Sequence, residues 1–425
     1  MVRRLFDDYY STTREFSANA RLFLLGTFLT WIGLSVNQVV FNLYLVEAGY
    51  KEDFVGRVVS MMGVGMALMA LPAGFLADRF GRRACLVAGG SLTALSLLVR
   101  ALTLTPGLLM ASTLTLGTAQ ALLTISASPF MSENSLEFER THLFSMHFVV
   151  VLLGGIAGNL SGGQLPALFR DRVALFDGSP LLAYRGALVV GAVASALSAW
   201  PLLALRESRP ERHADRPRVR ARDHAPLLGK LALNFALVGA GAGLIMPFFN
   251  LYFARRFLAD ARQIGLYFSV AQLLTAVATL TGPLLARRFG KLPAVTILQL
   301  ASLPFLVTLG FERTLAFAVV AFWMRSVLMQ MSSPLLNSFA MDTLPPELRA
   351  RANGIDNMCW YAGWAMSSAL AGWVISRFGY AYPYYFTAAL YGVATVTFYL
   401  NFRTEGARAG EGERTAAMEA LAADD

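Results

Sequence analysis

The stretch Gly74-Phe75-Leu76-Ala77-Asp78-Arg79-Phe80-Gly81-Arg82-Arg83 separates two long apolar runs, residues 54–76 and 84–104. Each run is long enough for a helix to cross the hydrocarbon core of a bilayer, which takes about 20 residues. Most of the ten residues between them are glycine or charged, and the three arginines favour the cytoplasmic side of a membrane. The stretch is therefore predicted to be a tight cytoplasmic turn between two transmembrane helices.

The composition of the whole chain agrees with a membrane protein. Of its 425 residues, 56% are hydrophobic and only 15% are charged, whereas soluble domains carry about 25% charged residues. The net charge of +9 could indicate a nucleic-acid partner, but the positions of the charges argue against one. Most lysines and arginines fall in the loops predicted to be cytoplasmic, so the basic charge sets the membrane orientation.

The apolar runs predict an all-α membrane protein with twelve transmembrane helices. We place them at residues 22–45, 54–77, 84–104, 107–131, 143–168, 181–205, 228–253, 263–286, 292–310, 315–340, 352–376 and 380–402. The charge bias predicts that both termini lie in the cytoplasm. We also expect the chain to reside in the plasma membrane, the inner membrane if the cell is bacterial.

The chain repeats itself after an offset of about 208 residues. Phe249-Asn250-Leu251-Tyr252-Phe253 follows Phe41-Asn42-Leu43-Tyr44-Leu45 at that offset, and Arg288-Phe289-Gly290-Lys291 follows Arg79-Phe80-Gly81-Arg82 one residue later. Further matches occur in the same order, at Glu133 and Asp342, Arg140 and Arg349, Gly154 and Gly363, and Gly163 and Gly372. The sequence therefore predicts two pseudo-symmetric bundles of six helices each.

The predicted domains follow from this repeat. Residues 1–21 form a cytoplasmic segment, 22–205 the first bundle and 227–402 the second bundle. Residues 206–226, rich in arginine and proline, are predicted to be a cytoplasmic linker, and residues 403–425 a cytoplasmic tail.

The pattern Gly-x-x-x-Asp-Arg-x-Gly-Arg-Arg at residues 74–83 resembles the signature between helices 2 and 3 of the major facilitator superfamily. The resemblance covers all but the tails and the linker, and it implies two halves that rock around a central site. It also implies a conformational gate in this loop, with Asp78 tethering the end of span 2 to the start of span 11 when the inner side is closed. The gate residues are Gly74, Asp78, Arg79, Gly81, Arg82 and Arg83.

Motifs for catalysis and cofactor binding are missing from the sequence. It contains no phosphate-binding Gly-x-x-x-x-Gly-Lys-[Ser/Thr] loop, no His-Glu-x-x-His zinc motif and no Gly-x-Ser-x-Gly nucleophile elbow. We therefore expect no enzyme, no cofactor and no metal. A non-transporting membrane scaffold is a further alternative, but it would have no reason to keep charged residues inside the membrane.

Polar side chains in spans 1, 4, 7 and 10 predict a substrate-binding cavity between the halves. The candidates are Asn37, Gln38, Asn42, Gln120, Asn250 and Arg325. Arg325 is the clearest, because a charge deep in a span is costly and is kept for function. The equivalent residue of the first half is Leu116. The mixture of amides, one arginine and aromatic residues suits an amphipathic or anionic small molecule.

Three titratable residues are candidates for proton coupling. His147 on span 5 and Asp356 on span 11 occupy equivalent positions of the repeat, and Glu133 lies in the loop after span 4. Histidine changes charge near neutral pH, which suits a proton carrier. The stretch 154–163 also resembles the helix 5 signature of antiporters in the superfamily, with Asn159 in place of its proline.

The resemblance and the in-membrane polar residues together predict a secondary transporter that works by alternating access. The leading prediction is proton-coupled export of a small amphipathic molecule by a monomer in the bilayer. A proton is the favoured coupling ion, and another ion is the alternative. The alternative is uptake of an organic anion with Arg325 as its counter-ion. A scaffold or a membrane enzyme is less favoured.

Overall fold

The computed structural model describes residues 16–173, 178–206 and 224–423. The described residues form helices joined by short connections, without β-strands. The greater part of the predicted linker lies outside the described residues, as does most of the N-terminal segment.

The first half contains six membrane-crossing segments, two of them broken. They are α2 (Ala18–Glu47), α3 (Glu52–Met69) with α4 (Pro72–Phe80), α5 (Arg82–Leu102), α6 (Pro106–Glu133), α7 (Glu137–Arg172), and α8 (Pro180–Leu197) with α9 (Ala199–Leu203).

The second half repeats this order. It contains α10 (Ala225–Ile245) with the short 3-10 helix η3 (Met246–Phe248) and α11 (Phe249–Phe257), α12 (Ala261–Thr279) with α13 (Gly282–Phe289), α14 (Lys291–Phe311), α15 (Leu315–Asp342), α16 (Pro346–Phe378) and α17 (Ala381–Ala423). Helix α17 runs past the predicted end of span 12 at residue 402, into a segment rich in alanine and glutamate, which favour helices.

The twelve predicted segments are therefore all present as helices. Eight described helices are long and apolar enough to cross a membrane by themselves, and two bent pairs raise this number to ten. Helices α16 and α17 take the places of the remaining two spans.

The bent pairs lie at equivalent places of the repeat. Helices α3 and α4 meet at 58°, and α12 and α13 at 42°. Proline lies at the start of both α4 and α13, as Pro72 and Pro283. Because proline has no N–H to donate to the preceding turn, it ends the incoming helix at that point. The polar stretch at residues 74–83 thus comprises most of the short helix α4, the turn at Gly81 and the first two residues of α5.

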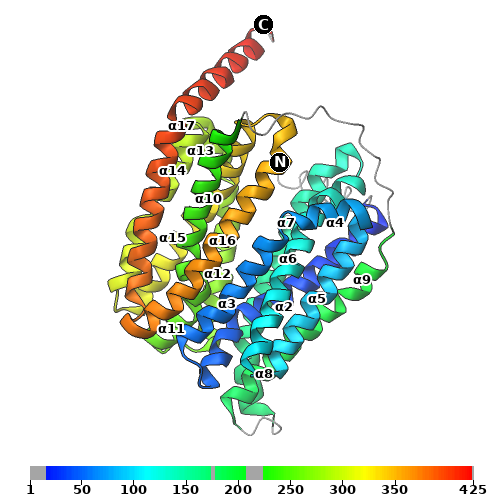
Figure 1. Cartoon of the computed structure of the whole chain (residues 1–425), viewed down its shortest axis with the longest axis vertical. Helices are drawn as coiled ribbons and strands as arrows, with labels where there is room; N and C mark the ends of the chain where they lie inside the picture. Colours follow the sequence, from blue (N-terminus) through cyan, green and yellow to red (C-terminus); the bar gives the residue numbers. More distant parts are fainter. Residues whose placement is uncertain (1–15, 174–177, 207–223, 424–425) are drawn as a thin grey trace, which may run out of the picture.

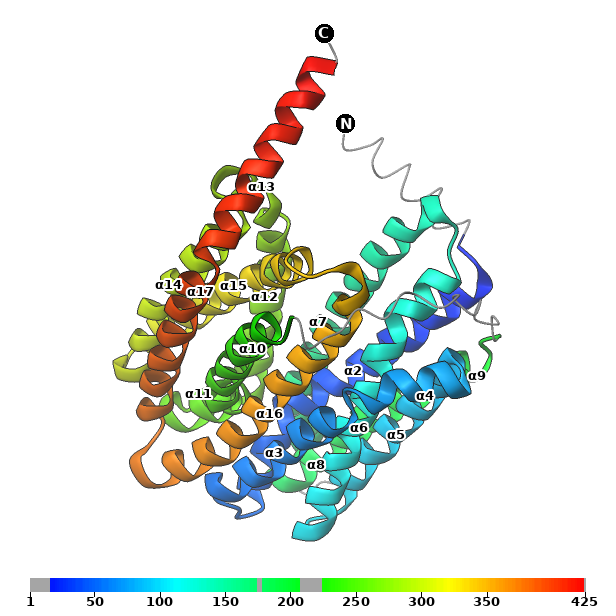
Figure 2. The ribbon, with the colours of Figure 1, turned by 45° about the horizontal axis from the view of Figure 1, so that its top comes forward.

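The two halves touch at one end of the molecule and spread apart toward the other (Figures 1 and 2). We call the end with α4 and α13 the inner end and the end with α11 the outer end. One hydrophobic cluster joins the halves near the outer end, with Val39, Tyr44, Phe249 and Tyr252 among its members. At the inner end each half has its own cluster, around Leu335 in the second half and around Phe130 in the first.

Side-chain contacts repeat between the halves as well. Tyr44 donates to the carbonyl of Ala101, and Tyr252, 208 residues later, donates to that of Leu309. At the inner end, Arg82 pairs with Glu133 at 3.4 Å, and Lys291 pairs with Asp342 at the equivalent place. The predicted pseudo-symmetry is therefore confirmed at the level of individual contacts.

The turns that follow α4 and α13 require glycine. Gly81 has φ 94° and Gly290 has φ 83°, a region that other residues enter at a cost of about 1–3 kcal/mol. We expect Gly81→Ala to destabilise the protein by that amount and to lower its melting temperature in detergent. Gly74→Ala is the matched control, because a Cβ at Gly74 within α4 would meet no atom within 4 Å. Equal melting temperatures for the two variants would contradict the assignment of backbone strain to Gly81.

Candidate functional site

The halves enclose a cavity of about 310 Å³ between them. Its wall comes from α2 and α7 of the first half and from η3, α11, α12 and α15 of the second. Five of its lining residues are aromatic, among them Trp31, Phe249 and Phe322. Arg325 is the charged residue of this wall. The volume suits a small molecule, because ligand pockets begin at about 300 Å³.

Aromatic groups hold Arg325 in the wall of this central cavity. Its Nη2 donates to the hydroxyl of Tyr391 at 3.1 Å. The guanidinium carbon lies 5.7 Å from the ring of Phe249 and 5.9 Å from that of Tyr391. Its Nε is buried and has no hydrogen-bond partner, and no carboxylate in the described part of the chain forms an ion pair with it. The positive charge is therefore not neutralised by an acid.

Gln38 lines the central cavity with Arg325, whereas Gln120 lines a neighbouring pocket inside the first half. A role in substrate binding stays a prediction for both. Asn37 is buried on α2, and its Nδ2 has no hydrogen-bond partner. It is not among the residues of either wall.

Asn42 and Asn250 lie together at the contact between the halves rather than in the cavity wall. Asn42 donates to the carbonyl of Pro247 at 2.6 Å, and Asn250 donates to that of Val39 at 3.0 Å. Val39 and Pro247 are themselves equivalent in the repeat, so the two bonds are reciprocal. Asn42 also donates to the side-chain oxygen of Asn250 at 3.2 Å. We call this contact the outer seam.

Other bonds between the halves extend from the outer seam toward the cavity. Tyr380 donates to Glu52 at 3.1 Å at the outer end. Asn159 on α7 donates to Gln272 on α12 at 3.2 Å, and both line the central cavity. In addition, Gly163 and Gly265 bring α7 and α12 so close that a Cβ on either would lie about 3 Å or less from the other helix's backbone.

The predicted gate residues surround the turn between α4 and α5. Asp78 is mostly exposed and pairs with Arg82 at 2.6 Å, and Arg82 also pairs with Glu133. Arg83 donates to the carbonyl of Leu203 at 2.9 Å, and Arg79 lies over the ring of Phe80. The predicted tether from Asp78 to the start of span 11 stays a prediction for a state whose inner end is closed.

The three proton-coupling candidates lie apart from one another. The imidazole of His147 stacks on Phe23, with ring centres 5.5 Å apart, in the pocket of the first half. Asp356 is buried on α16, and its Oδ2 has no hydrogen-bond partner. Glu133 belongs to the ion pairs at the inner end. The repeat therefore made His147 and Asp356 equivalent without bringing them into contact.

Several residues of the site were not among the sequence candidates. Tyr391, Phe249 and Gln272 were missed, although Phe249 belongs to the repeated Phe-Asn-Leu-Tyr motif. The sequence did not indicate Tyr391 or Gln272, because no sequence pattern distinguishes a tyrosine or glutamine that lines a cavity from one that packs inside the helix bundle.

Comparisons with known proteins agree with this arrangement. The sequence profile of the Major Facilitator Superfamily matches residues 23–233 and again 231–422. The chain therefore belongs to this superfamily of transporters. No curated protein matches the sequence significantly.

Solved structures with the same fold include a bacterial homologue of the human lysosomal transporter Spinster in an inward-facing, occupied conformation. It has a TM-score of 0.73 and 17% identity, over 91% of this chain and 96% of that one. The nucleoside transporter NupG has a TM-score of 0.72 and 16% identity, over 90% and 98% of the two chains. The human organic anion transporter MFSD10 has a TM-score of 0.62 and 18% identity, over 90% and 99%. At these identities the likeness shows the fold alone.

The outer seam yields a prediction about conformation. Asn42→Ala removes two hydrogen bonds between the halves, each worth about 0.5–1.5 kcal/mol. The balance should therefore shift roughly 5- to 100-fold toward states with an open outer end. Spin labels at Lys51→Cys and Arg313→Cys, both exposed in loops near the outer end, would report a longer distance by electron spin resonance.

Asn37→Ala serves as the control, because it removes a buried asparagine of the same helix that takes no part in the seam bonds. An unchanged distance distribution in Asn42→Ala would refute a closing role for the seam. So would an equal change in Asn37→Ala.

Proposed function

We propose that this protein is a secondary transporter of the cell membrane that moves a small amphipathic molecule carrying a negative charge. Its inner end faces the cytoplasm, and the central cavity is the substrate site. The observation that carries the proposal is Arg325, a buried guanidinium in the cavity wall without a carboxylate partner. A charge in such surroundings is weakly screened, so its field extends into the cavity and favours an anion there.

The rest of the wall favours an amphipathic substrate. Phe249, Phe268 and Phe322 offer ring surfaces around Arg325, and Gln38, Gln272 and Gln330 offer amides. Such a wall can bury an apolar body while its few polar groups orient the charged end.

Alternating access follows from the way the halves meet. The outer seam, Tyr380 and Asn159 join the halves between the outer end and the cavity, while the hydrophobic clusters of the inner end are separate. This arrangement supports a state in which the cavity is reached from the inner end. Rocking of the halves would break the outer seam and close the inner end.

The anion site is tested by substitution of Arg325. We expect Arg325→Ala to weaken the binding of an aromatic carboxylate, such as 3-phenylpropionate, by about 10- to 100-fold. A loss of this size corresponds to one hydrogen bond to a charged group. Arg325→Lys should recover part of the affinity, because it keeps the charge but loses the planar fork. Binding is measured by calorimetry on protein in nanodiscs, and transport by uptake into proteoliposomes.

Two controls make this experiment selective. The neutral amide 3-phenylpropionamide should bind the wild-type protein weakly and should be insensitive to Arg325→Ala. A folded Arg325→Ala protein with unaltered affinity for the carboxylate would disprove the anion site.

We further propose that export is driven by protons, with Asp356 and His147 as the carriers. A buried carboxyl group without a partner favours its neutral form until a conformational change brings it water. Asp356 fits this description, because it is buried and its Oδ2 has no partner. It lies two residues from Gly354, where an added Cβ would come within 2.8 Å of Leu71 of the first half. Rocking of the halves would thus change its surroundings.

Proton coupling is tested by separating driven transport from exchange. We expect Asp356→Asn or His147→Ala to abolish accumulation driven by a pH gradient while sparing the exchange of substrate across the membrane without a gradient. Glu347→Gln is the control, because Glu347 is an exposed acid in the first turn of the same helix. If the response to the gradient survives both substitutions, coupling by these residues is excluded.

A further inference from the structure

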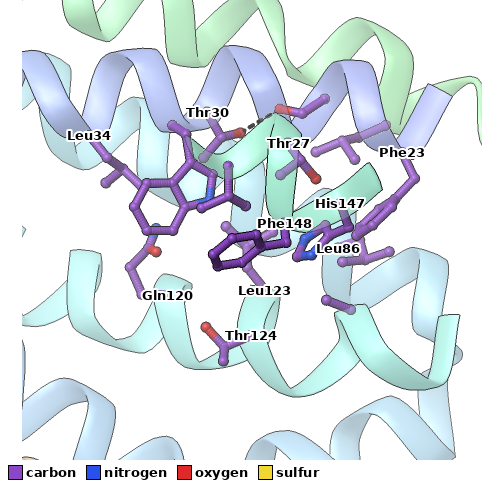
Figure 3. A pocket seen from close by; sticks show the side chains of 15 residues that line it. Phe23, Thr27, Thr30, Leu34, Leu86, Gln120, Leu123, Thr124, His147 and Phe148 are labelled. Atoms are coloured by element: carbon purple, nitrogen blue, oxygen red, sulfur yellow. Dashed lines mark hydrogen bonds between the residues drawn. The ribbon is translucent and has the colours of Figure 1, made fainter. Parts of the chain in front are cut away.

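A second pocket of about 260 Å³ lies inside the first half, between α2, α5, α6, α7 and α9. Figure 3 shows His147 and Phe23 side by side at one end of this pocket and Gln120 toward the other. Leu34, Leu86 and Leu123 form much of the remaining wall. We call it the N-half pocket.

The N-half pocket adjoins the central cavity. Trp31, Phe148 and Val151 line both. These three side chains are therefore a common wall of the two spaces, and Arg325 lies in the wall of the central cavity beyond them.

The chemistry of the N-half pocket differs from that of the central cavity. No lysine, arginine, aspartate or glutamate is among its lining residues. Two of its polar groups are engaged by the protein itself, since Gln120 donates to Thr93 at 3.1 Å and Thr30 donates to the carbonyl of Gly26 at 2.9 Å. Apart from His147, Thr27 and Thr124, the pocket thus offers apolar and aromatic surface.

The N-half pocket also departs from the internal repeat. The positions equivalent to Thr27 and Ala127 in its wall are Phe235 and Leu336 in the second half. Both larger residues belong to or pack against the hydrophobic cluster of that half, in which Leu336 is buried. At these two positions the first half carries the smaller side chain, whereas at Trp31, whose equivalent is Gly239, it carries the larger one.

We propose that the N-half pocket is a subsite for the apolar, ring-bearing part of the substrate whose anionic group faces Arg325. This inference rests on the proposed transport of an amphipathic anion and assigns its two ends to different halves. One bound molecule then contacts both halves at once, so its length as well as its charge decides how well it is recognised.

The experiment uses a series of carboxylates with a lengthening tail, from acetate through phenylacetate and 3-phenylpropionate to 4-phenylbutyrate and 6-phenylhexanoate. Affinity for the full-length protein in nanodiscs is measured by calorimetry. If the tail enters the N-half pocket, the affinity of the wild-type protein should rise about three- to fourfold for each added methylene.

The filling variants copy the second half into the first. Thr27→Phe with Ala127→Leu should abolish the gain from the long tails and leave the affinity for acetate unchanged. Ala111→Leu, an exposed position of the same helix α6 outside the pocket, should behave as the wild type. If the filled variant fails to fold, Leu123→Ala provides the complementary test, because it enlarges the pocket and should raise affinity for the longest tail relative to acetate.

The outcomes separate the subsite from the anion site. A gain with tail length that survives the filling variants, or that Leu123→Ala leaves unchanged, overturns the subsite whatever Arg325→Ala does. If filling abolishes the gain while Arg325→Ala changes nothing, the subsite stands and the anion proposal fails. Loss of the tail effect on filling, with a uniform loss of affinity in Arg325→Ala, supports both.

Discussion

The reciprocal bonds between Asn42 and Asn250 and the carbonyls of the opposite halves are the contact on which this conformation depends. A buried amide left without partners would cost about 1–3 kcal/mol, so the two asparagines keep the halves in register where they meet. The chain is interrupted at Pro247 in the second half and runs unbroken as α2 in the first, yet each half supplies an equivalent carbonyl acceptor. The halves are also joined along α7 and α12, where Asn159 bonds to Gln272, whereas their hydrophobic clusters at the inner end are separate.

Most of the fold could be predicted from the sequence, because the apolar runs and the repeat are strong signals. The pairs Arg82 with Glu133 and Lys291 with Asp342 follow from the offset once one of them is known. The roles of Asn42 and Asn250 did not follow, although their equivalence was clear. A repeat tells which residues correspond, but it does not tell whether a polar side chain faces a cavity or the other half. The breaks before Pro72 and Pro283 were also missed, since each pair of short helices reads as one apolar run.

Part of the candidate site, too, could be predicted from the sequence, and part could not. Arg325 was singled out from the sequence because a charge in an apolar run is conspicuous. The structure has it in the cavity wall, and its role in binding stays a prediction. The N-half pocket could not have been found so. Its wall includes the small residues Thr27 and Ala127, and small residues in membrane helices ordinarily serve close packing. The sequence does not tell whether a small residue allows close helix packing or lines a pocket, and the three-dimensional structure is needed to distinguish the two.

The symmetry of the outer seam has a consequence for the origin of the chain. Each half offers one asparagine donor and one carbonyl acceptor at equivalent positions, which is the self-complementary pattern of an isologous dimer contact. Two copies of a single six-helix protein could form the same seam without any change to it. The internal duplication then has a physical starting point in such a dimer. Fusion into one chain freed the copies to diverge, and Arg325 facing a half that has Leu116 instead is the kind of difference that two identical subunits could not have carried.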